Sequence, residues 1–256
     1  MAQTLASIGI YVAHGASGII ERDGETVLKR PFPNNDSSRQ EHLGLHHCIV
    51  RMLSWDYEQD ILKLEYMRNG NLKSYLDSNY CSVENKIRWV KQAADAFQLI
   101  ERGNPGLYCA KGIPSQFLHS KSVIHCDIKP DNFLLDEDLH LKISDFAGSS
   151  LSGSRALVCG SSRFLRPTMP GTPCEAQDDI FGLGSTIYTI ITGTGPFGEL
   201  ESAEVEARFW AAEFPDTSDV LFGDVIRSCW SGRASIEQVC SYIETSVRQM
   251  RESEQL

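Results

Sequence analysis

One run of the sequence, between His125 and Gly148, constrains the chain more than any other. It reads His-Cys-Asp-Ile-Lys-Pro-Asp-Asn-Phe-Leu-Leu and, after an acidic turn, Leu-Lys-Ile-Ser-Asp-Phe-Ala-Gly. Pro130 keeps the first half of the run out of a regular helix, so a loop is expected there. The two short apolar stretches that follow, Phe133–Leu135 and Leu141–Ile143, flank the acidic turn and predict a β-hairpin.

The polar side chains of this run can converge on one pocket. A loop can aim the carboxylate of Asp127, the ammonium of Lys129 and the amide of Asn132 in one direction. The hairpin then brings Asp145 back beside Asn132. A carboxylate and an amide oxygen there suit Mg²⁺, which prefers oxygen ligands and keeps substrate phosphates in its shell.

The remaining two side chains of the pocket suit phosphoryl transfer. Asp127 is free to orient a hydroxyl nucleophile and to accept its proton, and Lys129 can neutralise charge on the transferring group. Each of these residues alone would be read as a solvated turn residue. The four together, in this order and spacing, favour a catalytic site.

The pattern His-Cys-Asp-x-Lys-x-x-Asn at residues 125–132, followed by Asp145-Phe146, resembles the catalytic loop and metal-binding segment of eukaryotic protein kinases. The sequence Asp-Ile-Lys-Pro-Asp-Asn resembles that of the serine/threonine branch of the family. The resemblance extends, with gaps, from about Ala13 to about Ile243. It implies an α+β fold in one protein kinase domain over residues 1–256, with a small antiparallel sheet lobe to Met67 and a mainly helical lobe over residues 68–256.

A glycine-containing turn near the N-terminus is weaker support for the same family. Predicted strands at Ile8–Val12 and Ile19–Ile20 flank a turn over His14–Gly18, where backbone N–H groups could approach phosphate oxygens. Two of the three glycines of the kinase pattern GxGxxGxV are present. The resemblance implies that the nucleotide contacts Ala13, Gly15, Gly18, Ile20, Val27 and Lys29. Lys29 would bind the α/β-phosphates, although on its own it would be read as an ordinary strand-edge lysine.

The segment after Lys29 departs from the kinase pattern. Kinases place a helix there whose glutamate pairs with the lysine. Here residues 31–36 read Pro-Phe-Pro-Asn-Asn-Asp, which predicts a loop and leaves only Ser37–Leu45 for a helix, which Gly44 weakens further. Glu41 is the one internal acid of this short helix, so its pairing with Lys29 is left open.

Two more strands are predicted before the junction of the lobes, at Ile49–Trp55 and Asp60–Met67, and a helix begins near Leu72. The resemblance implies that the backbone groups of Glu65 and Met67 bind the adenine edge. It places Leu64 behind the adenine, and Leu134 among the residues that contact the nucleotide.

The helix predicted over Val83–Ile100 breaks at residues 101–106. Kinases keep the corresponding helix continuous up to the catalytic loop. Residues 99–116 therefore look like an insertion, for which we hypothesise an unspliced or misannotated origin. A spliced transcript that still encodes those residues would refute this hypothesis.

Two further features depart from the kinase pattern, and one residue matches it. Cys126 stands where an arginine commonly precedes the catalytic aspartate, and a thiol cannot receive an activation-loop phosphate as that arginine does. The loop over residues 149–173 lacks the usual Ala-Pro-Glu, which leaves Arg233 without an assigned partner. Asp179 resembles the buried aspartate that anchors the catalytic-loop backbone.

Composition narrows the function classes. Acidic residues outnumber basic ones by 34 to 24, for a net charge of −10, which argues against nucleic-acid or anionic-membrane partners. No apolar run is long enough to span a bilayer, and the N-terminus has no signal-peptide layout. Eight cysteines without a CxxC pair predict reduced thiols in a cytoplasmic or nuclear protein.

The function expected from these features is transfer of the γ-phosphoryl group of ATP to a Ser or Thr hydroxyl of a protein, with ATP and Mg²⁺ as cofactors. Two alternatives stay open. A pseudokinase, acting as an ATP-binding or scaffolding module, is favoured by the short helix, the insertion and the missing glutamate. A small-molecule phosphotransferase of related fold is the other.

Overall fold

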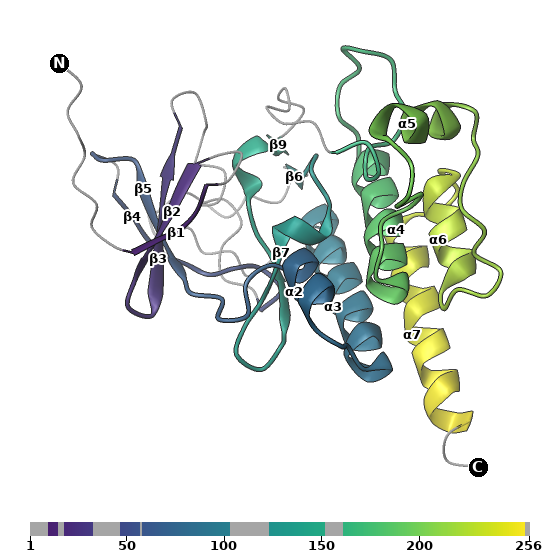
Figure 1. Ribbon diagram of the computed structural model, residues 1–256, viewed down its shortest axis with the longest axis horizontal. Coiled ribbons are helices and arrows are strands. Elements are labelled where there is room, and N and C mark those ends of the chain that lie inside the picture. The colour runs from purple at the N-terminus through teal and green to yellow at the C-terminus, as the bar shows by residue number, and fades with distance from the viewer. Residues whose placement is uncertain are drawn as a thin grey trace.

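Five strands form an antiparallel sheet in the N-terminal part of the chain (Figure 1). The computed structural model describes residues 10–14, 18–32, 47–56, 58–102, 123–151 and 161–253. The order across the sheet is β1-β2-β3-β5-β4. The strands are β1 (Ile10–His14), β2 (Gly18–Asp23), β3 (Thr26–Pro31), β4 (Met52–Asp56) and β5 (Ile61–Glu65).

The tight turn between β2 and β3 follows from its sequence. Gly24 adopts a φ of 60°, which glycine tolerates without steric cost, and Asp23 pairs with Thr26 across the turn. This hairpin sets the register that pairs Lys29 of β3 with Ile20 on one side and with Leu62 on the other. Lys29 therefore projects from the middle of the sheet rather than from its edge.

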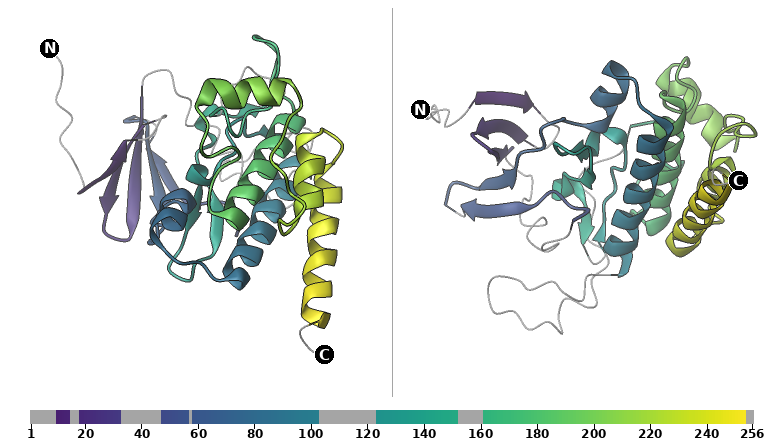
Figure 2. Two further views of the ribbon diagram at one scale, coloured as in Figure 1. Left: turned by 45° about the vertical axis from the view of Figure 1, so that its right-hand side comes forward. Right: turned by 90° about the horizontal axis from the view of Figure 1, so that it is seen from below.

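Helices make up most of the C-terminal part, as the resemblance implied. They are α2 (Leu72–Ser78), α3 (Val83–Arg102), α4 (Ala176–Thr192), α5 (Ser202–Trp210), α6 (Gly223–Trp230) and α7 (Ile236–Ser253). Helix α3 packs against α4 and α7, and α4 packs against α6 (Figure 2). Their apolar faces bury the largest side chains of the molecule, among them Trp89 and Phe181. Within the described residues, no helix combines the length and apolarity that a membrane crossing needs.

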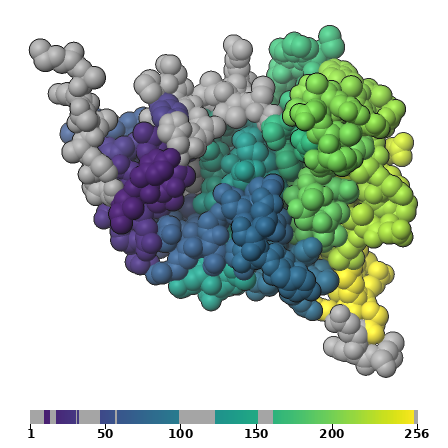
Figure 3. Space-filling view, viewed as in Figure 1, coloured from purple at the N-terminus to yellow at the C-terminus, as the bar shows by residue number. Residues whose placement is uncertain are grey.

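The middle of the chain lies between these two parts (Figure 3, teal). It contains β6 (Val123–Ile124), β7 (Phe133–Leu135), β8 (Leu141–Ile143), β9 (Ser150–Leu151), and the 3₁₀ turns η2 (Pro130–Asn132) and η3 (Phe146–Gly148). The hairpin predicted from the two apolar stretches is confirmed, because β7 and β8 pair antiparallel. Ile143 of β8 also binds the N-terminal part, through hydrogen bonds with Cys48 and Val50.

Several element boundaries differ from those predicted. Helix α3 continues to Arg102 instead of breaking after Ile100, because Glu and Arg are good helix formers. Strand β4 begins at Met52, since Ile49 forms a bridge to Ile143 instead. His14 belongs to β1 and not to the turn. The helix predicted over Ser37–Leu45, the turn residue Gly15 and residues 103–116 of the supposed insertion lie outside the described residues.

Candidate active site

The backbone of the catalytic loop is held by one carboxylate from α4. Asp179, in the first turn of that helix, accepts hydrogen bonds from the N–H of His125 at 2.6 Å and of Cys126 at 2.8 Å. Asp179 as a whole is only 5% exposed. Cys126 has a φ of 67°, a left-handed conformation that costs energy in a non-glycine residue and that these bonds help to maintain. The anchoring contact predicted for Asp179 is confirmed.

Asp127 is the centre of the polar cluster. The Asn132 amide donates from Nδ2 to the Asp127 carbonyl oxygen at 2.7 Å and to its Oδ2 at 3.0 Å. The Lys129 ammonium lies 2.7 Å from Oδ2 and 3.0 Å from Oδ1. The 3₁₀ turn that starts at Pro130 folds Asn132 back onto the loop. The structure thus confirms that the side chains of Asp127, Lys129 and Asn132 converge.

The hairpin returns the chain to the same polar cluster, as expected. Ser144 donates from its backbone N–H to the Asn132 carbonyl at 2.8 Å, which places the next residue, Asp145, beside the cluster. The Lys29 ammonium lies 2.6 Å from Oδ1 of Asp145. The Lys29 side chain is 7% exposed and that of Asp145 is 27% exposed, so this partly buried ion pair joins the sheet to the catalytic region.

This ion pair was not foreseen from the sequence. Lys29 and Asp145 are 116 residues apart, and no local pattern relates them. The partner considered for Lys29 was Glu41, which lies outside the described residues. The predicted hairpin could have indicated this pair, because it fixes the position of Asp145, which follows the second strand of the hairpin.

His125 supports the cluster from behind. Its ring packs edge-on against Phe146 with centroids 4.7 Å apart, and Nε2 lies 2.9 Å from the Ser144 carbonyl oxygen, to which it donates when protonated. Burial lowers the pKa of His125, and this outweighs the nearby carboxylates of Asp127 and Asp145, which act in the opposite direction. A neutral imidazole follows, acting in packing and orientation.

Apolar side chains assigned to the nucleotide gather in one cluster. Val27, Leu64, Met67 and Leu134 belong to the small core of the sheet lobe, where Leu64 and Met67 are buried and the other two are partly buried. The Glu65 carboxylate binds the Lys142 ammonium at 2.7 Å and accepts a hydrogen bond from the Arg51 N–H at 2.8 Å. The structure therefore brings together apolar residues predicted to lie near the nucleotide.

The glycine-containing turn is only partly described. Gly18 lies at the start of β2 and is buried, and Ala13 of β1 pairs with Ile20 of β2. Ala13 is exposed, and Gly15 lies outside the described residues. The described residues on both sides of the turn are adjacent strands, the arrangement that a phosphate-covering loop needs.

The donor set fits a magnesium ion. The Nδ2 group of Asn132 is engaged by Asp127, which leaves the amide oxygen as its metal-binding atom. Asp145 supplies a carboxylate directly after Ser144, whose backbone N–H binds the Asn132 carbonyl. Two oxygen ligands from the protein suit an ion that completes its shell with phosphate oxygens and water.

An arginine of the docking segment (residues 161–175, the described part of the loop between β9 and α4) was missed by sequence reasoning. Arg166 was noted only as part of a region that lacks the usual glutamate. In the structure its Nε donates to Asp178 Oδ1 at 2.7 Å and its Nη2 to Glu175 Oε2 at 3.0 Å. Glu175 and Asp178 also form the capping box of α4. Within the described residues Arg233 has no ion pair.

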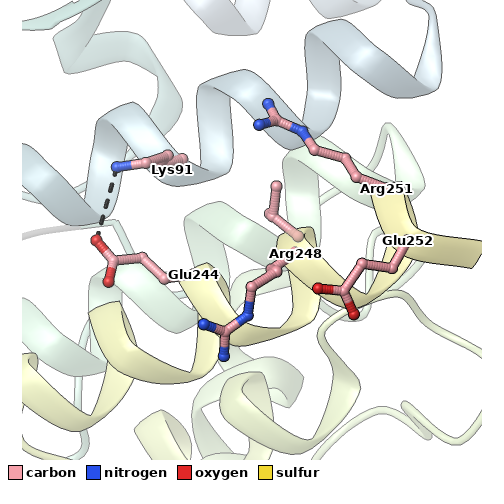
Figure 4. Close-up of a pocket in the computed structure, with 6 residues that line it drawn as sticks. Lys91, Glu244, Arg248, Arg251 and Glu252 are labelled. Carbon is pink, nitrogen blue, oxygen red and sulfur yellow. Dashed lines mark ion pairs between the residues drawn. The ribbon is translucent and has the colours of Figure 1, made fainter.

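A hollow of about 400 Å³ lies elsewhere, between α3 and α7 (Figure 4). Lys91 approaches Glu244 to 3.9 Å at one end of it. The remaining lining residues are Val247, Arg248, Arg251 and Glu252. Both cationic and anionic side chains line this hollow, so it has no clear preference for an anion or a cation. None of the predicted site residues lines it.

Comparison with known proteins gives consistent matches. A family model described as protein kinase domain matches residues 34–241. A putative leucine-rich repeat receptor-like serine/threonine-protein kinase of Arabidopsis thaliana is 30% identical over 71% of this chain and 20% of its own length. Aurora/IPL1-related protein kinase 2 of Caenorhabditis elegans is 29% identical over 78% of this chain and 63% of its own length.

Aurora kinase C of Mus musculus is 30% identical over 87% of this chain and 77% of its own length. The chain spans less than two thirds of the length of the first curated relatives that it matches.

Proposed function

The chain belongs to the protein kinase family, and we propose that it transfers the γ-phosphoryl group of ATP to a serine or threonine hydroxyl of a protein substrate. One observation carries the proposal most directly. Asp127, Lys129 and Asn132 are locked together by hydrogen bonds of 2.7 to 3.0 Å. That arrangement presents a carboxylate, an ammonium and an amide to one acceptor, which phosphoryl transfer requires.

Each side chain of the cluster has a proposed task. Asp127 orients the acceptor hydroxyl and takes its proton, because its carboxylate is held on both sides by Lys129 and Asn132. Lys129 moves from Asp127 toward the transferring phosphoryl group as negative charge builds there. Lys29 leaves Asp145 to bind the nucleotide phosphates, a change that exchanges one charge-assisted bond for another.

We propose Mg²⁺ as the metal, held by Asn132 and Asp145. When bound, the ion neutralises phosphate charge and helps to align the nucleotide. Without it, Asp145 would keep its bond to Lys29, and both groups would be withheld from the nucleotide. Metal and nucleotide are therefore expected to bind together rather than separately.

A module that binds ATP without turnover is the second candidate. The short helix expected over Ser37–Leu45 and the missing glutamate of the docking segment favour it. The retained set of five polar residues speaks against it, because binding alone does not require a held base or a charge stabiliser. These residues are Lys29, Asp127, Lys129, Asn132 and Asp145.

The experiment follows the label from γ-labelled ATP with Mg²⁺ into unstructured protein substrates and, in parallel, into small alcohols. Label on serine or threonine of proteins is expected, and Lys29→Met should weaken ATP binding as well as transfer. Lys63→Met, at a partly exposed position in the neighbouring strand, is the matched control. ATP binding with no transfer by the wild type would support the non-catalytic module, and label only on small alcohols would redirect the substrate class.

We also propose a protein rather than a nucleic acid or a membrane as the partner, and a cytoplasmic or nuclear location. The acidic balance of the chain and the free thiols of the described cysteines support this proposal. Imaging of a fluorescently tagged chain tests the location. Accumulation in a secretory compartment would contradict it.

A further inference from the structure

The docking segment and the catalytic loop both bind the first turn of α4. Arg166 of the docking segment donates from Nε to Asp178 Oδ1 at 2.7 Å. The next residue, Asp179, accepts two backbone N–H groups of the catalytic loop at 2.6 and 2.8 Å. Two neighbouring carboxylates of one helix therefore hold the two segments, one carboxylate for each.

A second contact brings the same three parts of the molecule together. Gly182 lies one turn further along α4. A β-carbon at Gly182 would lie 2.8 Å from the Ile128 carbonyl oxygen, in the catalytic loop, and 3.2 Å from the Phe164 carbonyl oxygen, in the docking segment. The backbones of the loop and of the segment therefore both pack against this position of α4, where glycine permits their close approach.

Arg166 neutralises part of an acidic helix start. Glu175, Asp178 and Asp179 place three carboxylates within five residues, and the partial positive charge of the helix N-terminus offsets part of their repulsion. Arg166 binds two of them, because its Nη2 also donates to Glu175 Oε2 at 3.0 Å. The Asp178 side chain is 10% exposed and that of Glu175 is 61% exposed, so the bond to Asp178 is the less screened of the two.

The beginning of the docking segment has an anchor of its own. Arg163 donates from Nη2 to the carbonyl oxygen of Phe197 at 3.1 Å and to that of Leu200, in the loop that follows the C-terminal end of α4. Arg163 thus fixes the segment near one end of α4. Arg166 fixes it to the other end, which also holds the catalytic loop.

We propose that Arg166 is a positioning residue for the protein acceptor, because it fixes the docking segment to the helix that also holds the catalytic loop. This inference rests on the proposed function, since it assigns acceptor binding to the docking segment. Asp127 directly follows the two residues that Asp179 binds, so one helix sets the placement of the base relative to the acceptor. Phosphoryl transfer depends on such placement, and a displacement of about 1 Å can slow a reaction by about a hundredfold.

Arg166→Gln removes the charge and retains a polar side chain. We expect kcat/KM for a protein acceptor to fall by at least about tenfold. Hydrolysis of ATP by water and the KM for ATP should stay within about twofold of the wild type, because neither uses the docking segment. Arg166→Lys should lose less, since an ammonium can replace one of the two bonds but lacks the fork that binds two carboxylates.

Arg208→Gln is the matched control. Arg208 of α5 also binds two carboxylates, those of Glu204 at 3.2 Å and Glu213 at 3.4 Å, and neither belongs to α4 or to the docking segment. All three kinetic quantities should therefore stay within about twofold of the wild type in this variant. Melting curves verify that each variant is folded at the assay temperature.

Amide hydrogen exchange tests the contact without an acceptor. Peptides from residues 161–175 should exchange at least about threefold faster in Arg166→Gln, whereas those from residues 123–128 should exchange as in the wild type, because Asp179 keeps its bonds. Unchanged exchange in the docking segment, or equal losses of protein transfer and ATP hydrolysis, would overturn the proposal. A wild-type chain that labels no protein would overturn the proposed function, and the exchange comparison then decides by itself whether Arg166 fixes the segment.

Discussion

At the scale of single residues, the catalytic loop depends on groups that never touch a substrate. Asp179 binds two backbone N–H groups with one buried carboxylate, and the residue after Cys126 is the proposed base. His125 packs behind the cluster as a neutral ring. The geometry at Asp127 is thus set by its neighbours in sequence and by a helix more than fifty residues away.

Replacing Asp179 by Asn is expected to lower the free energy of unfolding by about 1–3 kcal/mol. The amide keeps one acceptor oxygen but turns an NH₂ group toward a backbone donor, which leaves a buried donor unsatisfied. Urea denaturation measures the difference. Asp131→Asn, at an exposed position of the same loop, should remain within about 0.5 kcal/mol of the wild type. Equal effects of the two changes would contradict the anchoring role.

His125 should make stability depend on pH. Burial lowers the pKa of His125 in the folded protein, so the unfolded chain binds its proton more readily near the ordinary value of about 6.5. The free energy of unfolding should therefore fall as the pH drops from 7 toward 5.5 and should be insensitive to this group above 7.

The comparison needs a variant without the titrating ring. His125→Phe keeps an aromatic ring beside Phe146 and is expected to flatten the pH dependence of unfolding measured by urea denaturation. His140, which is exposed and lies 3.3 Å from Asp136, is the control position, and His140→Gln should leave the wild-type slope in place. A slope that survives His125→Phe would assign the effect to other groups.

At the scale of elements, the catalytic loop packs against α4. A β-carbon at Gly182 would lie 2.8 Å from both the Cβ and the carbonyl oxygen of Ile128, which sits between Asp127 and Lys129. A β-carbon at Gly184 would lie 2.6 Å from the Cβ of Cys229, on α6. One face of α4 therefore supports the catalytic loop, and the other supports the helical core.

These two glycines separate an effect on stability from an effect on catalysis. Gly182→Ala and Gly184→Ala should each destabilise the fold by about 1–3 kcal/mol through overpacking. Only Gly182→Ala displaces Ile128, so it alone should slow phosphoryl transfer, by roughly tenfold or more, at a temperature where both variants are folded. Transfer rates beside melting curves provide the measurement. Equal loss of rate in both would show that α4 does not position the loop.

Helices and strands whose own residues show a hydrophobic periodicity could be predicted from the sequence. Contacts between residues far apart in the sequence could not. The apolar stretches at Phe133–Leu135 and Leu141–Ile143 and the helical spacing after Val83 carry their own periodicity, so the hairpin and α3 appeared as expected. The bonds of Arg166 to α4 did not, because a loop arginine and a helical carboxylate share no periodicity.

At the scale of the whole molecule, the described residues of the sheet lobe and of the helical lobe form separate cores of unequal size. The helical lobe holds a large contiguous core, whereas the sheet lobe has a small cluster around Leu62 and Leu64. The Lys29–Asp145 ion pair and the hydrogen bonds of Ile143 connect the two. A small core stabilises its lobe less, since hydrophobic stabilisation scales with buried area.

Amide hydrogen exchange should reveal this difference. Without nucleotide, the amides of β2 and β3 are expected to exchange faster than those of α3 and α4. ATP with Mg²⁺ should slow exchange in β2 and β3, because ligand binding stabilises the lobe that it contacts. Lys29→Met should lose most of that protection, whereas Lys63→Met should keep it. Exchange in β3 that is unaffected by ATP in the wild type would contradict nucleotide binding at Lys29.

The central claim is that Asp127 acts as the base of a phosphoryl-transfer site, and a single-turnover measurement tests it most directly. The chain is loaded with γ-labelled ATP and Mg²⁺, mixed with a protein acceptor, and the label on serine or threonine is followed with time. Asp127→Asn should bind ATP as the wild type does and transfer at least about a hundredfold more slowly. Asp131→Asn should match the wild type, and comparable rates in all three proteins would contradict the account.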